Sequence, residues 1–546
     1  MSRRETILSA LLVFVVALLV RTYFAAQIVF PKPEDTAYYV GVARNLLDGR
    51  GLVSDALWSY ATPPLVFPRP AFEVWLPLPT FLAAVPMALF GSTFGAAQVS
   101  SVLIGAIVPV LAWRLAADVA AERGLPEGRA RTLALGTGLT SAVYLPLLLH
   151  SALPDSTMPF AALALGAGLL MNRITREPRG ARLTDPRLIV LGVVLGLAAL
   201  TRNEAAWLAI VWVVIAWTVA STTIAQRIRL IATVGIVALA IFAPWAARNW
   251  LVFGSPLPGQ AVTNAFSVTG FDIFAWNDPP TLSRYLAAGP ARLVEMRVEG
   301  IGHNLGSVLL LPGFPISLIG LVALPWQARG RTLRAVLLFS VLTFLVTSLA
   351  FPVATTWGTF LHAAGPVQVL LVLSAMLALD AGLARLGGRL GWTRPVAWLG
   401  ALLGVFSSLL FSAALLPSFG GGSRATAAYY DELGQRMAAI GRPLDATAGP
   451  VISNFPIWIA ESQRISALAL PDEAPADVVD LAATFPGTRY LVLTSPESEH
   501  WPGDLEAAAP GSECFTPVDL GAHKGTGDDP LAGTTVYEIA CPPGAP

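Results

Sequence analysis

The chain has 546 residues, of which 55% are hydrophobic and 13% are charged. Soluble domains carry about 25% charged residues, so this composition excludes an ordinary soluble protein and predicts an integral membrane protein. Basic and acidic residues balance at 35 each, so no overall positive charge favours the binding of nucleic acid.

The first predicted element is an apolar segment near residues 7–30, long enough to cross a bilayer. No small-residue cleavage site follows it, so we expect a retained span and not a cleaved signal peptide. Arg3 and Arg4 precede it. By the positive-inside rule they place the N-terminus in the cytoplasm.

Further apolar stretches of spanning length predict a polytopic α-helical membrane protein with about eleven spans. After the first, they lie near 94–117, 132–150, 155–172, 187–201, 205–222, 230–250, 306–327, 335–352, 364–382 and 396–416. Basic residues are concentrated in alternate loops, as expected for cytoplasmic loops. These loops are 121–131, 172–187, 226–229, 327–334 and 385–394.

The apolar segment 72–91 is treated differently, because counting it as a span would reverse every later loop. It contains Pro77, Pro79 and Pro86, which disfavour a regular spanning helix. We expect a juxtamembrane or re-entrant helix that returns to the outer face. Residues 1–416 then form one transmembrane module, with large outer loops at 31–93 and 251–305.

Beyond Pro417 the composition becomes polar, and the segment SFGGGSR resembles a linker. Strand-like runs (PVISN, RYLVLTS, TTVYEIA) alternate with helical patterns, which predicts a small extracytoplasmic α/β domain at 417–546. Outside the cytoplasm, Cys514 and Cys541 are expected to form a disulfide. Two free buried thiols are the alternative.

Charged and histidine side chains collect at the outer ends of the predicted spans. Ionisable groups at membrane depth are costly, so those that are retained are candidates for function. They are Glu34, Asp35, Arg69, His150, Asp155, Arg202, Glu204, Arg248 and His362.

Each candidate also has a purely structural interpretation. Asp35 fits the N-cap of the helix TAYYVGVARNLLDG, and Asp155 fits a cap of the span that follows it. Arg248 fits an interfacial anchor whose charge reaches water. Arg202 fits a local ion pair with Glu204, and the two histidines fit interfacial hydrogen bonding.

The combination favours group transfer from a lipid phosphate. A carboxylate can take the proton of an acceptor hydroxyl as general base. Arginines can hold a phosphate and neutralise the charge that develops as it leaves.

Several motifs together resemble the membrane glycosyltransferases of the GT-C fold, specifically the protein O-mannosyltransferase-like group (family 39) and its aminoarabinose-transferase-like relatives. The stretch DTAYYVGVARNLLDGRG follows the first span as the family's Asp-containing helix does. RPAFEVW through LFG resembles its re-entrant helix, and GLAALTRNE and PWAARNWLVFGSPLP resemble two later motifs. The similarity covers roughly residues 1–260 and extends weakly to 416.

The resemblance implies sugar transfer from a polyprenyl-phosphate donor to an acceptor hydroxyl, with inversion at the sugar carbon. Asp35 would be the catalytic carboxylate, with Glu34 beside it. Arg69, Arg202 and Arg248 would bind the donor phosphate. Thr36 stands where many relatives have Glu, which leaves a second carboxylate and a requirement for Mg²⁺ or Mn²⁺ open.

The resemblance also implies a location in the inner cell membrane, with an acceptor that is a protein, a lipid or a glycan. Two other classes remain as alternatives: a secondary transporter or lipid flippase, and a non-catalytic membrane scaffold. A transporter would be expected to show internal repeats and polar groups near the midplane. Here the charges lie at the outer ends.

Overall fold

This computed structural model describes residues 3–176, 185–218, 223–258, 260–392, 396–445, 449–494, 498, 500–523, 525 and 528–541. The chain divides into two compact units. Unit 1 comprises residues 1–27, 75–248 and 297–419, and unit 2 comprises residues 28–74, 249–296 and 420–546. Parts of the predicted basic loops 172–187 and 385–394 lie outside the described residues.

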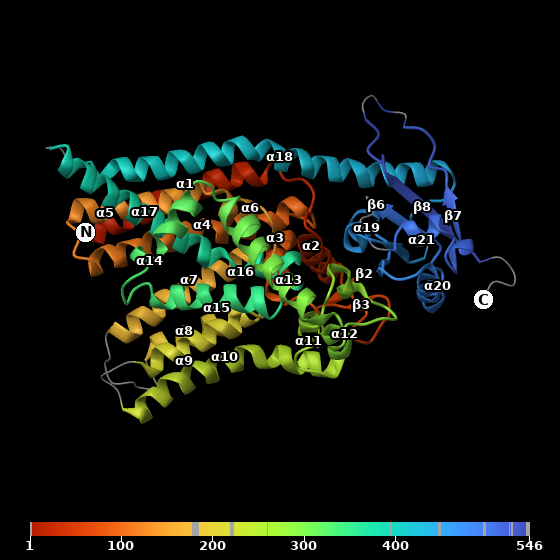
Figure 1. Cartoon of the computed structure of the whole chain (residues 1–546), viewed down its shortest axis with the longest axis horizontal. Helices are drawn as coiled ribbons and strands as arrows, with labels where there is room; N and C mark the ends of the chain where they lie inside the picture. The colour runs from red at the N-terminus through yellow and green to blue at the C-terminus, as the bar shows by residue number, and fades with distance from the viewer. Residues whose placement is uncertain are drawn as a thin grey trace. The chain divides into compact units, whose positions relative to one another are not determined.

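Unit 1 is built from helices (Figure 1). They are α1 (Arg3–Ala25), α3 (Leu78–Phe90), α4 (Phe94–Glu122), α5 (Glu127–Val143), α6 (Leu145–Ser151), α7 (Thr157–Arg176), α8 (Pro186–Ala199), α9 (Ala205–Trp217), η2 (His303–Leu310), α14 (Ile316–Gln327), α15 (Arg334–Leu349), η3 (Ala354–Trp357), α16 (Thr359–Ala363) and α17 (Gly365–Arg389). Three more helices have residues in both units: α10 (Ile224–Phe253), α13 (Gly289–Gly302) and α18 (Ala397–Ala439).

The helices confirm a polytopic membrane protein. Among the described residues, six helices are long and apolar enough to cross a bilayer, and a seventh span results if α5 and α6, which meet at 54°, count as one. Five shorter apolar helices are α3, α8, α9, α14 and α15. The count of eleven spans therefore stays a prediction. Helix α3 has 13 residues, fewer than the roughly 20 needed to cross, which is consistent with the expected re-entrant or juxtamembrane helix.

The outward faces of unit 1 are apolar. Ile236 and Leu239 of α10 are each 67% exposed, and Phe406 of α18 is 55% exposed. Such side chains are at home against lipid tails, where the hydrophobic effect no longer drives helices together. Close packing is achieved instead by small residues. A Cβ at Gly192 or Gly196 of α8 would come within 2.6 Å of Val237 or Ile241 of α10.

Unit 2 combines short helices with sheets (Figure 1). Its helices are α2 (Glu34–Leu47), α11 (Gln260–Ala265), η1 (Gly270–Phe274), α12 (Leu282–Ala287), α19 (Pro456–Gln463), α20 (Pro475–Thr484), α21 (Gly503–Glu506) and η4 (Ser512–Cys514). Its strands are β1 (Val53–Ser54), β2 (Ala56–Leu57), β3 (Arg69–Pro70), β4 (Val451–Ser453), β5 (Ala467–Ala469), β6 (Tyr490–Thr494), β7 (Phe515–Val518) and β8 (Thr534–Ile539).

The main sheet of unit 2 has six strands in the order β2-β5-β4-β6-β8-β7. Strands β2, β5, β4 and β6 run parallel, and β8 pairs antiparallel with β6 and β7. Strand β2 comes from the segment between α2 and α3 and places Ala56 opposite Ala467. The α/β unit thus includes residues 28–74 and 249–296 in addition to the C-terminal region.

Two local features of the C-terminal region bear on the sequence expectations. The SFGGGSR segment, expected to be a linker, is helical and lies within α18. Cys514 and Cys541 form a disulfide with their Cα atoms 4.1 Å apart.

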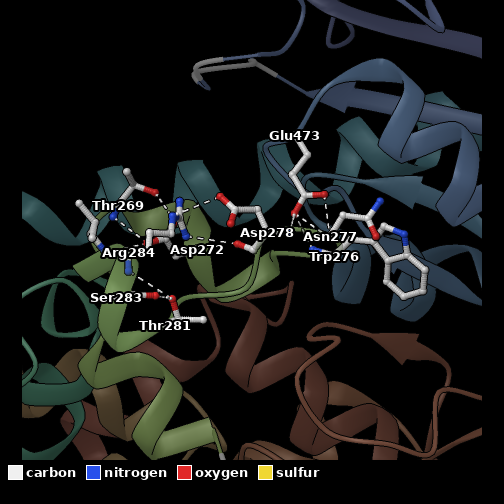
Figure 2. A network of polar contacts seen from close by, with 10 residues as sticks. Thr269, Asp272, Trp276, Asn277, Asp278, Thr281, Ser283, Arg284 and Glu473 are labelled. Atoms are coloured by element: carbon white, nitrogen blue, oxygen red, sulfur yellow. Dashed lines mark hydrogen bonds and ion pairs between the residues drawn. The ribbon is translucent and has the colours of Figure 1, made fainter. Parts of the chain in front are cut away.

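The segment 249–296 is held to the C-terminal region chiefly by the buried carboxylate of Glu473 (Figure 2), and Trp276 and Asn277 also donate side-chain bonds to Asp480 and Asp477. Glu473 Oε1 accepts the backbone N–H groups of Trp276 at 2.8 Å, Asn277 at 3.0 Å and Asp278 at 3.1 Å. Within the loop, Arg284 Nη2 lies 2.8 Å from Asp272 Oδ1. Charge-assisted bonds of this kind are roughly twice as strong as neutral ones, so the loop has a defined conformation.

Candidate functional site

The candidate residues fall into one group in each unit. Glu34, Asp35 and Arg69 belong to unit 2, whereas His150, Asp155, Arg202, Glu204, Arg248 and His362 belong to unit 1. Each group is described by itself.

Asp35 lies in the first turn of α2, shortly after the first span ends at Ala25. The N-cap of α2 is Pro33, whose carbonyl accepts the N–H groups of Thr36 and Ala37. Asp35 is therefore not the N-cap, and this structural interpretation of the residue is wrong. Its half-buried carboxylate stands where the N–H groups of a helix favour negative charge.

Glu34 uses both carboxylate oxygens inside unit 2. Oε1 accepts the backbone N–H of Ile457 in the first turn of α19 at 2.9 Å, and Oε2 accepts Trp58 Nε1 at 3.3 Å. Burial raises the pKa of Glu34 to about 8. The negative charge of Asp35 raises this pKa further, whereas the two hydrogen bonds lower it. At neutral pH the side chain is thus mostly protonated, and it joins α2 to α19.

Arg69 is fully buried. Its Nη2 donates to the carbonyl of Thr62 at 2.5 Å, its Nη1 donates to the carbonyl of Pro64, and its Nε lies 3.5 Å from Glu73 Oε1. The guanidinium therefore organises the loop 62–73. Its assignment to the donor phosphate stays a prediction.

Tyr38 connects this loop to the helix that carries Asp35. Its hydroxyl accepts the N–H of Phe72 at 2.7 Å, and the two rings meet edge to face with centroids 5.9 Å apart. Residues three apart on a helix share a face, so Tyr38 lies on the same side of α2 as Asp35. The sequence motif contained this tyrosine, but sequence reasoning gave it no role.

In unit 1, His150, Asp155 and His362 come together. The distance from Asp155 Oδ2 is 3.5 Å to His150 Nδ1 and 3.7 Å to His362 Nδ1. The other oxygen of Asp155, Oδ1, accepts the N–H of Thr157 at 2.7 Å, in the turn between α6 and α7. All three side chains are buried. Asp155 thus orders the turn before α7, as expected for a cap, and also faces two histidines.

Arg202 and Glu204 form a bidentate ion pair with N–O distances of 3.0 and 2.9 Å. Arg202 also donates to Ser156 Oγ at 2.8 Å and to the carbonyl of Thr359 at 3.2 Å. The pair lies beside the turn that carries Asp155 and beside the first residue of α16. The local pairing considered from the sequence is present, and Arg202 additionally bridges two chain segments.

Arg248 lies near the end of α10. Its guanidinium carbon stands 4.9 Å from the centre of the Trp245 ring, a cation–π geometry. The side chain is half-buried. This arrangement fits an interfacial anchor and leaves phosphate binding as a prediction.

Sequence reasoning missed Arg21, which is fully buried within α1. Arg21 donates to Ser151 Oγ at 2.9 Å and to the carbonyl of Ala142 at 2.8 Å. It therefore supports the end of α6, next to His150, and the carbonyls left free at the α5–α6 bend. A single arginine within an apolar span was the signal available in the sequence.

Comparison with known proteins identifies the fold. No family model and no curated protein matches the chain. Solved structures of ArnT from Cupriavidus metallidurans match it over 97% of both chains at 14% identity, with TM-scores of 0.56 for the form bound to undecaprenyl phosphate and 0.52 for the apo form. The archaeal oligosaccharyltransferase AglB from Archaeoglobus fulgidus matches 89% of this chain and 69% of its own length at 13% identity, with a TM-score of 0.48.

At this identity the likeness establishes architecture. The assignment to family 39 stays a prediction. The chain has the GT-C fold and is a multi-pass membrane protein.

Proposed function

We propose that the protein is a glycosyltransferase that moves a sugar from a polyprenyl-phosphate donor to an acceptor hydroxyl. The observation that carries the proposal is the full-length likeness to ArnT, one structure of which has undecaprenyl phosphate bound. Support from the residues is the carboxylate of Asp35 in the first helical turn after the first span. A transporter or flippase is not favoured by this likeness.

Asp35 is the residue that we assign as general base. It takes the proton of the acceptor hydroxyl while the oxygen attacks the anomeric carbon, and the polyprenyl phosphate leaves from the opposite side. A single displacement of this kind inverts the configuration of the sugar carbon. Positioned general bases typically contribute about 10²- to 10⁴-fold to the rate. Glu34, whose oxygens are bonded to α19 and Trp58, holds the start of α2.

The leaving phosphate requires positive charge, since its negative charge increases as the bond breaks. Arg202 and Arg248 are the half-buried candidates on unit 1. Arg202 divides its charge between Glu204 and the phosphate, and Arg69 of unit 2 binds a phosphate only by exchanging a carbonyl partner for a phosphate oxygen. That exchange is favourable in principle, because bonds between two ions are stronger than bonds to a neutral carbonyl.

We place the reaction on the extracytoplasmic face, with the N-terminus in the cytoplasm and the C-terminal domain outside. Residues 1–416 supply the catalytic module. The domain at 417–546, which forms one compact unit with the outer loops 28–74 and 249–296, admits the acceptor. The acceptor is a protein, a lipid or a glycan that offers a hydroxyl.

The donor class can be tested with purified wild-type protein in proteoliposomes. Radiolabelled polyprenyl-phosphate sugars and the matching nucleotide sugars are offered separately, with a mixture of envelope acceptors, and labelled product is counted. The proposal predicts transfer from the lipid-linked donors only. Transfer from nucleotide sugars instead, or transport of the label without a new glycosidic bond, contradicts it. Proton NMR of the product then reads the anomeric configuration and tests inversion.

A further inference from the structure

The two histidines and the aspartate of unit 1 have a geometry that the proposed sugar transfer does not explain. His150 ends α6, Asp155 lies in the turn before α7, and His362 lies in α16. One ligand-type atom from each of the three lies within 4.8 Å of the other two. Two distant chain segments, the α6–α7 turn and α16, thus converge on one buried point.

The distances are too long for good hydrogen bonds. Asp155 Oδ2 stands 3.5 Å from His150 Nδ1 and 3.7 Å from His362 Nδ1, whereas N–H···O bonds measure about 2.7–3.2 Å. Among the described residues, Asp155 Oδ2 and His150 Nδ1 are both fully buried atoms without a hydrogen-bond partner. Buried polar atoms of this kind are costly and call for an explanation.

The same distances suit a metal ion. In a tetrahedral site with ligand bonds of about 2.0–2.1 Å, neighbouring ligand atoms lie roughly 3.3 Å apart. We propose that His150, Asp155 and His362 are three ligands of a buried site for a transition-metal dication of the Zn²⁺ class.

The donor set decides which ion fits. Two imidazoles and one carboxylate suit zinc and its neighbours in the first transition series, whereas magnesium and calcium prefer oxygen ligands. The proposed Zn²⁺ site is therefore a different matter from the requirement for Mg²⁺ or Mn²⁺ that the sequence left open. Three protein ligands leave a fourth position for water. Thr157 Oγ1 lies at hydrogen-bond distance, 2.7 Å, from His362 Nδ1, and His362 exchanges this contact for the metal when the ion binds.

Neighbouring residues support the ligands in the way that partners of metal ligands do. The N–H of Thr157 binds Asp155 Oδ1 and so turns Oδ2 toward the histidines. Gly358, with φ of 108°, stands against the far side of the His362 ring, where a Cβ would lie 3.1 Å from Nε2. The nearby charge of Arg202 is balanced by Glu204, so an incoming cation meets one uncompensated carboxylate.

The first experiment needs no variant. Full-length protein, purified in detergent with a tag that contains no histidine, is stripped with a chelator and titrated with Zn²⁺, Co²⁺ or Mg²⁺ alone. The proposal predicts about one Zn²⁺ per chain, which is the stoichiometry of a closed single site. It also predicts that protein loaded with Co²⁺ shows the intense visible absorption of a tetrahedral Co²⁺ site, and that the protein takes up no Mg²⁺. Failure of the wild-type protein to bind Zn²⁺ stoichiometrically overturns the proposal, whatever its sugar-transfer activity.

Variants then locate the site. Asp155→Asn and His362→Gln keep size and polarity, and each is expected to weaken Zn²⁺ binding by at least about 100-fold, the upper end of what loss of a mere supporting partner costs. His500→Ala is the matched control, because His500 Nδ1 lies 2.8 Å from Asp504 Oδ2 in unit 2 and offers an unrelated histidine–carboxylate pair. The assignment is refuted if His500→Ala lowers the Zn²⁺ content whereas Asp155→Asn and His362→Gln both leave it unchanged.

Discussion

The neighbouring carboxylates Glu34 and Asp35 can be separated by one substitution, Glu34→Gln. Glutamine is nearly isosteric with the protonated glutamate, and its carbonyl oxygen can keep the bond from the Ile457 N–H, which measures 2.9 Å in the wild type. Because the pKa of Glu34 is raised to about 8, the variant mimics the form that prevails at neutral pH. We expect sugar transfer within about threefold of wild type, equivalent to less than about 0.7 kcal/mol of barrier.

The same substitution should change how stability depends on pH. The folded protein holds the Glu34 proton up to about pH 8, whereas the unfolded chain releases it near 4.5. The folded state thus binds more protons within this window, so stability is greatest below it and falls as the pH rises through it. At about 1.4 kcal/mol per pH unit, the effect amounts to at most about 5 kcal/mol.

The assay is thermal unfolding of purified protein in detergent between about pH 4 and pH 9, the range that brackets the two pKa values of 4.5 and about 8. Wild type should lose apparent Tm as the pH rises, and Glu34→Gln should show a shallower slope. Glu506→Gln, which alters an exposed glutamate of α21, should keep the wild-type slope. An unchanged slope in Glu34→Gln, or a loss of transfer as severe as a base deletion, refutes the assignment of Glu34 as a half-buried, mostly neutral residue.

Two further predictions concern the stability of unit 2. Arg44→Met removes the bidentate partner of Glu461, a pair that is only 9–11% exposed, and leaves the carboxylate with Arg464, 56% exposed, at 3.5 Å. Unfolding measurements should show a loss of at most about 3–5 kcal/mol. Arg50→Met, whose side chain is 45% exposed, should cost about 0–1 kcal/mol, and equal losses would contradict this. Glu473→Ala removes the acceptor of three loop N–H groups. Amide hydrogen exchange at 276–278 should therefore become faster, while the amides of β6 stay protected. Unchanged exchange at 276–278 would show that other contacts hold the loop.

The sequence predicted the GT-C fold and part of the main sheet. The runs PVISN, RYLVLTS and TTVYEIA correspond to β4, β6 and β8. Strand β2 was missed because two residues carry no periodicity, and its place beside β5 is set by pairing over about 400 positions in the chain.

The candidate site was predicted only in part. Asp35, Asp155 and Arg202 stood out because charge is rare near apolar spans. The burial of Arg69 against backbone carbonyls and the support of α6 by Arg21 depend on tertiary contacts, which a single sequence does not encode locally. The glycines of SFGGGSR suggested a break, yet the segment is helical within α18, because tertiary context overrides intrinsic propensity.

The central claim is that Asp35 is the base of a lipid-dependent glycosyltransferase. Its most direct test is sugar transfer from a radiolabelled polyprenyl-phosphate sugar pool in membranes that contain wild type or Asp35→Asn at equal expression. The account predicts a loss of about 10²- to 10⁴-fold, the usual contribution of a general base, with the thermal stability of the variant unchanged. Transfer at the wild-type rate by Asp35→Asn would contradict it.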